Sequence, residues 1–444
     1  MTISPFAAWM LAQEARALLT RLARVKPFAL LEPMLPAAAL QPGAQAATER
    51  YLVAGRREMR AMVLGFLAWL HGAQAQQASA AEAQRRFTIL RLKFNAVLTQ
   101  FDLFNDVISQ RSEHDTGVWL CGLDIVAADA LALPGYYEVP PLMCYLDRGV
   151  GAAIRRARTR LPGGGESPVA VIRVPRERMV GSGIASSLIH EVGHQASALL
   201  DLANSLRPLL QGMQRGGGNA WRLFERWIGE ILSDFWSCAR LGIAATMGLM
   251  GVVSLPRAFM FRLNLDDPHP VPWIRVRLSC AMGQAMYPHP QWARLAALWD
   301  AYYPLDGLDS GTRRLFDELL AAMPGFVGLL VDHRPRSLRG RSLKEALGVA
   351  DRQPAQLAAT FRTWRGAPAA LYRAPPTLVF AVLGQARANG QITPEEESHL
   401  FAKLLTHWAL RGALRGATTC AGATADAARM FAVHSRQEPG LTVV

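Results

Sequence analysis

Two histidines and a glutamate near the middle of the chain have the types and spacing of a metal-dependent hydrolytic site. Residues 187–195 read Ser-Leu-Ile-His-Glu-Val-Gly-His-Gln, with His190 and His194 four positions apart. On a helix this spacing places both imidazoles on one face, where they can bind a single Zn²⁺. Glu191 can then act as a general base on water. The bare motif also arises by chance, and the alternative is a pair of buried histidines on an ordinary helix.

The residues around the motif predict a helix. Ser182 is a suitable N-cap, and apolar residues then recur at helical spacing until Pro208 and the glycines at 216–218. Gly193 inside this helix costs about 1 kcal/mol of stability relative to alanine. We therefore expect another segment to pack closely there, either at a metal site or as an ordinary neighbouring strand.

A catalytic zinc needs a third protein ligand, and an acidic pair downstream supplies a candidate. Glu230 and Asp234 are four positions apart in an apolar stretch that also holds Trp227, Phe235 and Trp236. Buried carboxylates without partners are costly, so this pair calls for a cation or strong hydrogen-bond donors. The alternative is a solvated acidic face, which the aromatic neighbours disfavour.

The two motifs together, His190-Glu191-x-x-His194 and Glu230-x-x-x-Asp234, resemble the gluzincin branch of zinc metallopeptidases, the thermolysin-like group. The resemblance implies that one Zn²⁺ per chain is bound by His190, His194 and Glu230. It also implies that Glu191 is the catalytic base. Asp234 would accept the other ring N–H of His190 and so fix the orientation of that ring. The extended metzincin motif is absent, because no Gly and His follow His194 at the required offsets.

A third segment, residues 266–275, resembles the His-Pro-x-x-x-x-Arg element of the CAAX prenyl endopeptidase and heat-shock endopeptidase family. The resemblance implies that His269 and Arg275 face the active site. A hydrogen-bond donor there stabilises the oxyanion of the tetrahedral intermediate by about 3–4 kcal/mol. The alternative is a proline-rich turn whose arginine begins a helix, and His289 is a weaker candidate for the histidine. The whole resemblance covers roughly residues 165–280.

The composition indicates a globular protein, with 51% hydrophobic and 19% charged residues. The net charge of +13 comes mainly from arginines spread along the chain, with local clusters at residues 155–160 and 334–341. No nucleic-acid-binding motif accompanies these clusters. We therefore expect solvated basic faces and no specific nucleic-acid partner, with charge-driven nucleic-acid binding as an alternative function.

Cysteine usage and hydropathy bear on the compartment. The 5 cysteines are widely spaced and form no Cys-x-x-Cys pair, which disfavours a disulfide framework and indicates a reducing environment. Glu14 interrupts the N-terminal apolar residues, so we expect no signal peptide. The longest uncharged apolar run, residues 241–255, is shorter than the roughly 20 residues that span a bilayer. We expect a buried helix there, no transmembrane segment and a cytoplasmic protein.

The apolar pattern divides the chain into three regions. Residues 1–115 predict a helical N-terminal region, with helices at 6–22, 49–73 and 79–109. Residues 116–300 predict a zincin-like metallopeptidase domain, whose short strands lie within 116–180. Residues 301–444 predict a helical C-terminal region, in which Thr393-Pro394-Glu395-Glu396 marks a helix start. The expected fold class is α+β, predominantly α-helical, with a zincin-like core and a small mixed sheet.

Val169–Val174, between two prolines, predicts a strand just before the motif helix. In zincins an edge strand at this place binds extended substrate, so this segment is the candidate substrate strand, and a plain core strand is the alternative. The glycines at 163–165 form a loop but no phosphate-binding motif, because no Gly-Lys-Ser/Thr follows.

The predicted function is that of a zinc-dependent endopeptidase with a protein or peptide substrate. The main alternative is a non-catalytic, zinc-stabilised helical scaffold that binds partners. Glu191 argues against that alternative, because a structural zinc site has no use for a base.

Overall fold

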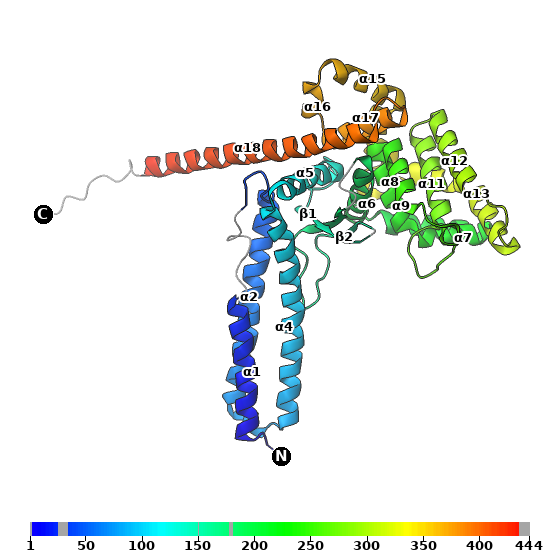
Figure 1. Cartoon of the computed structure of the whole chain (residues 1–444). Coiled ribbons are helices and arrows are strands. Elements are labelled where there is room, and N and C mark those ends of the chain that lie inside the picture. Colours follow the sequence, from blue (N-terminus) through cyan, green and yellow to red (C-terminus); the bar gives the residue numbers. More distant parts are fainter. Residues whose placement is uncertain (1, 25–33, 150, 177–180, 435–444) are drawn as a thin grey trace.

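The computed structural model describes residues 2–24, 34–149, 151–176 and 181–434, without side chains at 182, 184, 215–217 and 416–434. The described chain is mostly helical with one three-stranded mixed sheet, which confirms the predicted predominantly helical α+β class. Figure 1 shows an N-terminal helical arm, the sheet at its upper end and a larger group of helices beyond the sheet. The last helix, α18, runs back past the arm and projects from the body.

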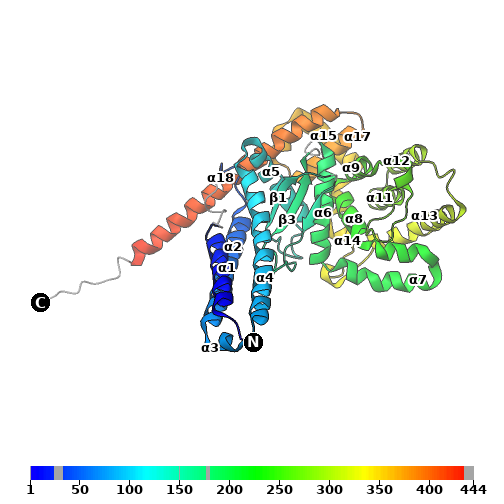
Figure 2. The same ribbon diagram turned by 60° about the horizontal axis from the view of Figure 1, so that its bottom comes forward.

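Three long helices build the arm, which Figure 2 shows from another side: α1 (Pro5–Arg24), α2 (Pro42–His71) and α4 (Ala80–Ser109), with the short α3 (Ala73–Gln77) between the last two. Their apolar faces form one hydrophobic cluster, in which Leu18, Val63 and Phe94 are buried. The three predicted helices are therefore confirmed. The second begins earlier than expected because Pro42 occupies its first turn, where a missing N–H costs nothing.

The sheet consists of β1 (Leu142–Asp147), β2 (Ala153–Arg155) and β3 (Ala170–Pro175) in the order β1-β3-β2, with β3 parallel to β1 and antiparallel to β2. β3 is thus the central strand. Ile172 and Val174 face the main core, whereas Val171 packs with the arm. The prediction of Val169–Val174 as an edge strand for substrate is wrong, and the plain core strand is correct. A strand buried on both faces reads as a continuous apolar run.

Side chains cover the outer edge of β1. Gln110 both donates to the carbonyl oxygen of Leu146 and accepts from its N–H, each at 2.8 Å. Arg111 and Asp124 form a fully buried ion pair. Arg111 donates to the carbonyl oxygen of Cys144, and Asp124 accepts from the Cys144 N–H. The other edge strand of the described sheet is β2, and no such side-chain hydrogen bonds cover its outer side.

Two local predictions around the motif helix need correction. Residues 114–131 form α5 (His114–Leu131), not strand-like pieces, because a helix buried around most of its circumference shows no amphipathic period. The motif helix α6 (Ser182–Leu199) is preceded by Gly181 at φ 73°, so Ser182 is its first residue and not its N-cap. A positive φ suits glycine at this position.

The helix after α6 also differs from the prediction. α6 ends at Leu199, and Asp201, with φ 52°, leads into α7 (Leu202–Arg226). Pro208 lies inside α7 and does not stop it, and the chain turns instead at Gly218, with φ 71°.

The remaining helices share one hydrophobic core with α5, α6 and one face of the sheet. They are α8 (Ile228–Leu241), α9 (Ile243–Val253), α10 (Arg257–Met260), α11 (Pro272–Met286), α12 (Pro290–Tyr302), α13 (Ser310–Val331), α14 (Leu343–Ala346), α15 (Pro354–Gly366), α16 (Ala369–Arg373), α17 (Pro376–Ala388) and α18 (Pro394–His434).

Two predicted features of these helices are present. α18 begins as expected, because the Glu396 N–H donates to Thr393 Oγ1 and the Thr393 N–H donates to Glu396 Oε2. The apolar run from Leu241 forms the helix α9 after a break at Gly242. Among the described residues, no helix combines the length and the apolar character needed to cross a membrane.

A close contact between α6 and α8 sets the position of the motif. A Cβ atom on Gly193 would lie 2.7 Å from Ser233 Cα and 3.0 Å from the Ser233 carbonyl oxygen, both on α8. Gly193 therefore lets the backbones of the two helices meet between the histidines and the acidic pair. This confirms the expectation of close packing at the candidate metal site, and the neighbouring element is a helix, not a strand.

We expect Gly193→Ala to destabilise the metal-free protein by about 1–3 kcal/mol, because overpacking outweighs the gain of about 1 kcal/mol in helix propensity. The matched control is Gly229→Ala on α8, where an added Cβ meets no atom within 4 Å. Urea unfolding followed by circular dichroism measures both variants. Equal stability of the two variants would contradict the close contact.

Candidate metal centre

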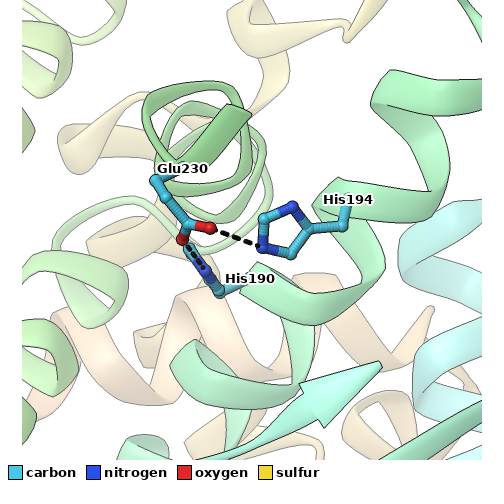
Figure 3. A group of neighbouring side chains, drawn as sticks. All are labelled: His190, His194 and Glu230. Atoms are coloured by element: carbon cyan, nitrogen blue, oxygen red, sulfur yellow. Dashed lines mark hydrogen bonds and ion pairs between the residues drawn. The ribbon is translucent and has the colours of Figure 1, made fainter. Parts of the chain in front are cut away.

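α6 and α8 bring the three predicted ligands together (Figure 3). Glu230 Oε2 lies 3.1 Å from His190 Nε2, and Glu230 Oε1 lies 3.5 Å from His194 Nε2. The two imidazole rings stand nearly perpendicular, with their centroids 4.9 Å apart. One ligand atom from each residue lies within 4.8 Å of the other two, so the group can hold a metal ion.

The distances are compatible with a metal ion held between the three side chains. Ligands placed tetrahedrally at about 2.1 Å from zinc lie about 3.4 Å from one another. The 3.1 Å from Glu230 Oε2 to His190 Nε2 and the 3.5 Å from Glu230 Oε1 to His194 Nε2, measured from the two oxygens of one carboxylate, are both close to this value. Two imidazole nitrogens and one carboxylate are also the protein ligands of a known class of catalytic zinc sites that keep a fourth position open.

Asp234 hydrogen-bonds His190 at Nδ1, the ring nitrogen that does not face Glu230. Asp234 Oδ1 accepts from His190 Nδ1 at 2.8 Å, which is the contact expected from the sequence. With the proton on Nδ1, the Nε2 lone pair of His190 is directed to the metal group. Asp234 lies one helical turn after Glu230 on α8, so a single helix supplies both the carboxylate ligand and the residue that orients a histidine ligand.

Arg275, on α11, pairs with Asp234. Its Nε donates to Asp234 Oδ2 at 2.7 Å, and its Nη2 donates to Oδ1 at 2.9 Å. Sequence analysis predicts an oxyanion donor here, but this two-point contact favours a positioning role behind His190. The buried ion pair links α11 to the α6–α8 contact.

His269 lies in the loop before α11, with its side chain 44% exposed. Its Nε2 is 3.1 Å from Glu230 Oε2, and its Nδ1 is 2.6 Å from Asp267 Oδ1. His269 therefore stands at the edge of the metal group with one ring nitrogen towards it. Sequence analysis missed Asp267, although an aspartate two residues before the histidine is a signal for such a contact. His289, the weaker candidate, caps α12 by accepting from the Gln291 N–H.

Glu191 lines a cavity of about 110 Å³ together with His190, Asp234, His269 and Arg275. Its side chain is buried, and no hydrogen bond or ion pair to it is seen among the described residues. A buried carboxylate beside the metal group that no described residue hydrogen-bonds has the placement that a general base on water requires.

Charge and burial compete at this group. Burial alone lowers the pKa of His190, but the charge and hydrogen bond of Asp234 raise it to about 9. Burial raises the pKa of Glu230, but hydrogen bonds from His190, His194 and His269 hold it far below its usual range. Without metal, the group therefore contains a carboxylate facing a protonated His190.

No family model, curated protein or solved structure matches this chain. The case for a metal site therefore rests on the ligand group itself and on the residues that hold it.

We expect the purified protein to bind about one Zn²⁺ per chain, measured by inductively coupled plasma mass spectrometry. His190→Ala and His194→Ala should each abolish tight binding, because two remaining ligands do not hold a catalytic zinc firmly. His289→Ala is the control, since this histidine caps α12 and does not belong to the ligand group. Full zinc occupancy in the double variant of His190 and His194 would contradict the site.

The raised pKa of His190 predicts that zinc affinity increases with pH. Below its pKa of about 9 the imidazole carries a proton that zinc must displace, so the apparent affinity should rise about tenfold per pH unit from pH 7 towards pH 9. Asp234→Asn removes the charge that raises the pKa and should flatten this slope above pH 7. Calorimetric titration in buffers of different ionisation enthalpy counts the released proton, and a pH-independent affinity over this range would refute the argument.

Proposed function

We propose that this protein is a zinc-dependent endopeptidase that hydrolyses peptide bonds. The observation that carries the proposal is the buried Glu191 carboxylate beside a ligand group of two histidines and one glutamate. A structural zinc site is closed by four protein ligands and has no base. Three ligands with an adjacent buried carboxylate that is not itself a ligand favour hydrolytic chemistry.

Each residue of the site has its own role in the proposed hydrolysis. A bound zinc supplies Lewis acidity, which polarises a carbonyl group and lowers the pKa of water to about 7. Glu191 takes the proton of the attacking water and passes it to the leaving amine. His269, at the rim, would donate a hydrogen bond to the oxyanion. Asp234 and Arg275 keep His190 oriented.

The edge strand β2 supplies a place for an extended peptide. Gly151 and Ala152, directly before β2, line the cavity that Glu191 also lines. A peptide added to the outer side of β2 would form main-chain hydrogen bonds and pass the metal group. This arrangement favours a protein or peptide substrate, and it assigns to β2 the role that sequence analysis gave to β3.

The compartment and the alternative functions follow from other observations. The four cysteines with described side chains, Cys121, Cys144, Cys238 and Cys280, are free and buried, which favours a reducing compartment such as the cytoplasm. The long arm in Figure 1 is the feature that would serve a non-catalytic scaffold. The arginine clusters are the only feature in favour of charge-driven nucleic-acid binding. A test of catalysis distinguishes the endopeptidase from both alternatives.

We expect Glu191→Gln to retain zinc but to lose about 10²–10⁴-fold in peptidase activity, because an amide does not accept the proton of water. Glu230→Gln should instead weaken zinc binding. Cleavage of a mixture of unstructured peptides, followed by mass spectrometry at matched zinc content, measures the activity. Near-normal turnover by the Glu191→Gln protein would contradict the mechanism.

A further inference from the structure

The cavity beside Glu191 extends away from the ligand group into a pocket between α6, α8, α9 and α11. Its walls carry the hydroxyls of Ser186, Ser237 and Ser279 and the apolar side chains of Ala245, Leu249 and Val252. We call these six residues the serine-lined pocket. Of the three candidate ligands only His190 lines this cavity, so the pocket adjoins the metal group on the side of His190 and the proposed base.

The serine-lined pocket is small and its floor is fixed. A Cβ atom on Gly248 of α9 would lie 2.3 Å from Ser186 Oγ and 2.6 Å from Ser186 Cβ, so α9 already touches α6 there. The cavity measures about 110 Å³ in total. A cavity of about 150 Å³ accommodates benzene, so a phenyl ring exceeds the available space.

The six residues of the serine-lined pocket are uncharged, although Glu191 lines the same cavity. Ser186 Oγ donates to the Gly183 carbonyl oxygen at 3.2 Å, and Ser237 Oγ donates to the Ser186 carbonyl oxygen at 3.4 Å. Asp234 and Arg275, which line the same cavity, form an ion pair with each other. An acidic substrate side chain would therefore lie beside the Glu191 carboxylate without a counter-ion, which is strongly unfavourable.

We propose that the serine-lined pocket binds the substrate side chain next to the scissile bond and selects small side chains, those of alanine, serine, cysteine and threonine. The inference rests on the proposed peptidase function, because it assigns a substrate class to that site. The serine hydroxyls of the pocket accept a hydrogen bond from a substrate hydroxyl or thiol. The apolar wall of the pocket packs against a substrate methyl group.

The first test compares peptides that differ only at the two residues flanking the scissile bond. At one of these positions, wild type should cleave alanine and serine peptides with at least a tenfold higher kcat/KM than phenylalanine or lysine peptides. Leu249→Ala widens the pocket and should raise kcat/KM for the phenylalanine peptide at least about tenfold. Met250→Ala, on the same helix and outside the pocket lining, is the matched control and should leave the preference unchanged. Equal cleavage of small and aromatic residues at both positions would overturn the inference.

The second test separates this inference from the proposed function, because it needs no turnover. Peptide hydroxamates chelate zinc, and calorimetry measures their binding to the zinc-loaded protein. An alanine-derived hydroxamate should bind at least about tenfold more tightly than its phenylalanine counterpart, and Leu249→Ala should reduce this ratio. If this preference holds while no peptide is cleaved, the endopeptidase proposal fails and the pocket stands. If both hydroxamates bind equally, the pocket assignment fails even when peptides are cleaved.

Discussion

The structure depends on how a buried group of charges is kept neutral between apolar helices. Glu230 and Asp234 lie on α8 among tryptophans and other core residues, and burying two carboxylates there without partners is strongly unfavourable. His190 comes from α6 and Arg275 from α11, and each compensates part of that charge. Because the partners sit on three helices, the positions of α6, α8 and α11 are coupled. The group that fits a metal ion is therefore also a structural junction.

The ligand group follows from the sequence because its parts are local. Helical spacing alone puts His190 and His194 on one face, and the same spacing relates Glu230 to Asp234. Gly193 adds the remaining information, since a helix residue without a side chain indicates that another backbone comes close. The pairing of the two helices and the role of Glu230 as a ligand came from the resemblance to the gluzincins, and the high cost of buried, unpaired acids supported them. The helical fold class follows from apolar periodicity in the same way.

The parts that sequence analysis misassigned depend on contacts between distant segments. β3 is the central strand because β2 pairs with its second edge. β2 is only three residues long and has no sequence signal of its own. The partner of Arg275 is fixed by the packing of α11 on α8, and a motif gives no direction for its guanidinium. Ser182 as N-cap failed for a local reason, because Gly181 adopts a positive φ that the pattern does not encode.

The candidate metal site and the proposed substrate pocket share residues. Asp234 accepts from His190 on one side and lines the cavity beside Glu191 on the other, with Arg275 next to it. A substrate side chain that entered the cavity would contact the same ion pair that orients a metal ligand. A bulky or charged side chain there would strain that pair, and through it the orientation of His190. A small, neutral side chain leaves the pair intact, so restricting the pocket to small groups also protects the geometry on which the ligand group relies.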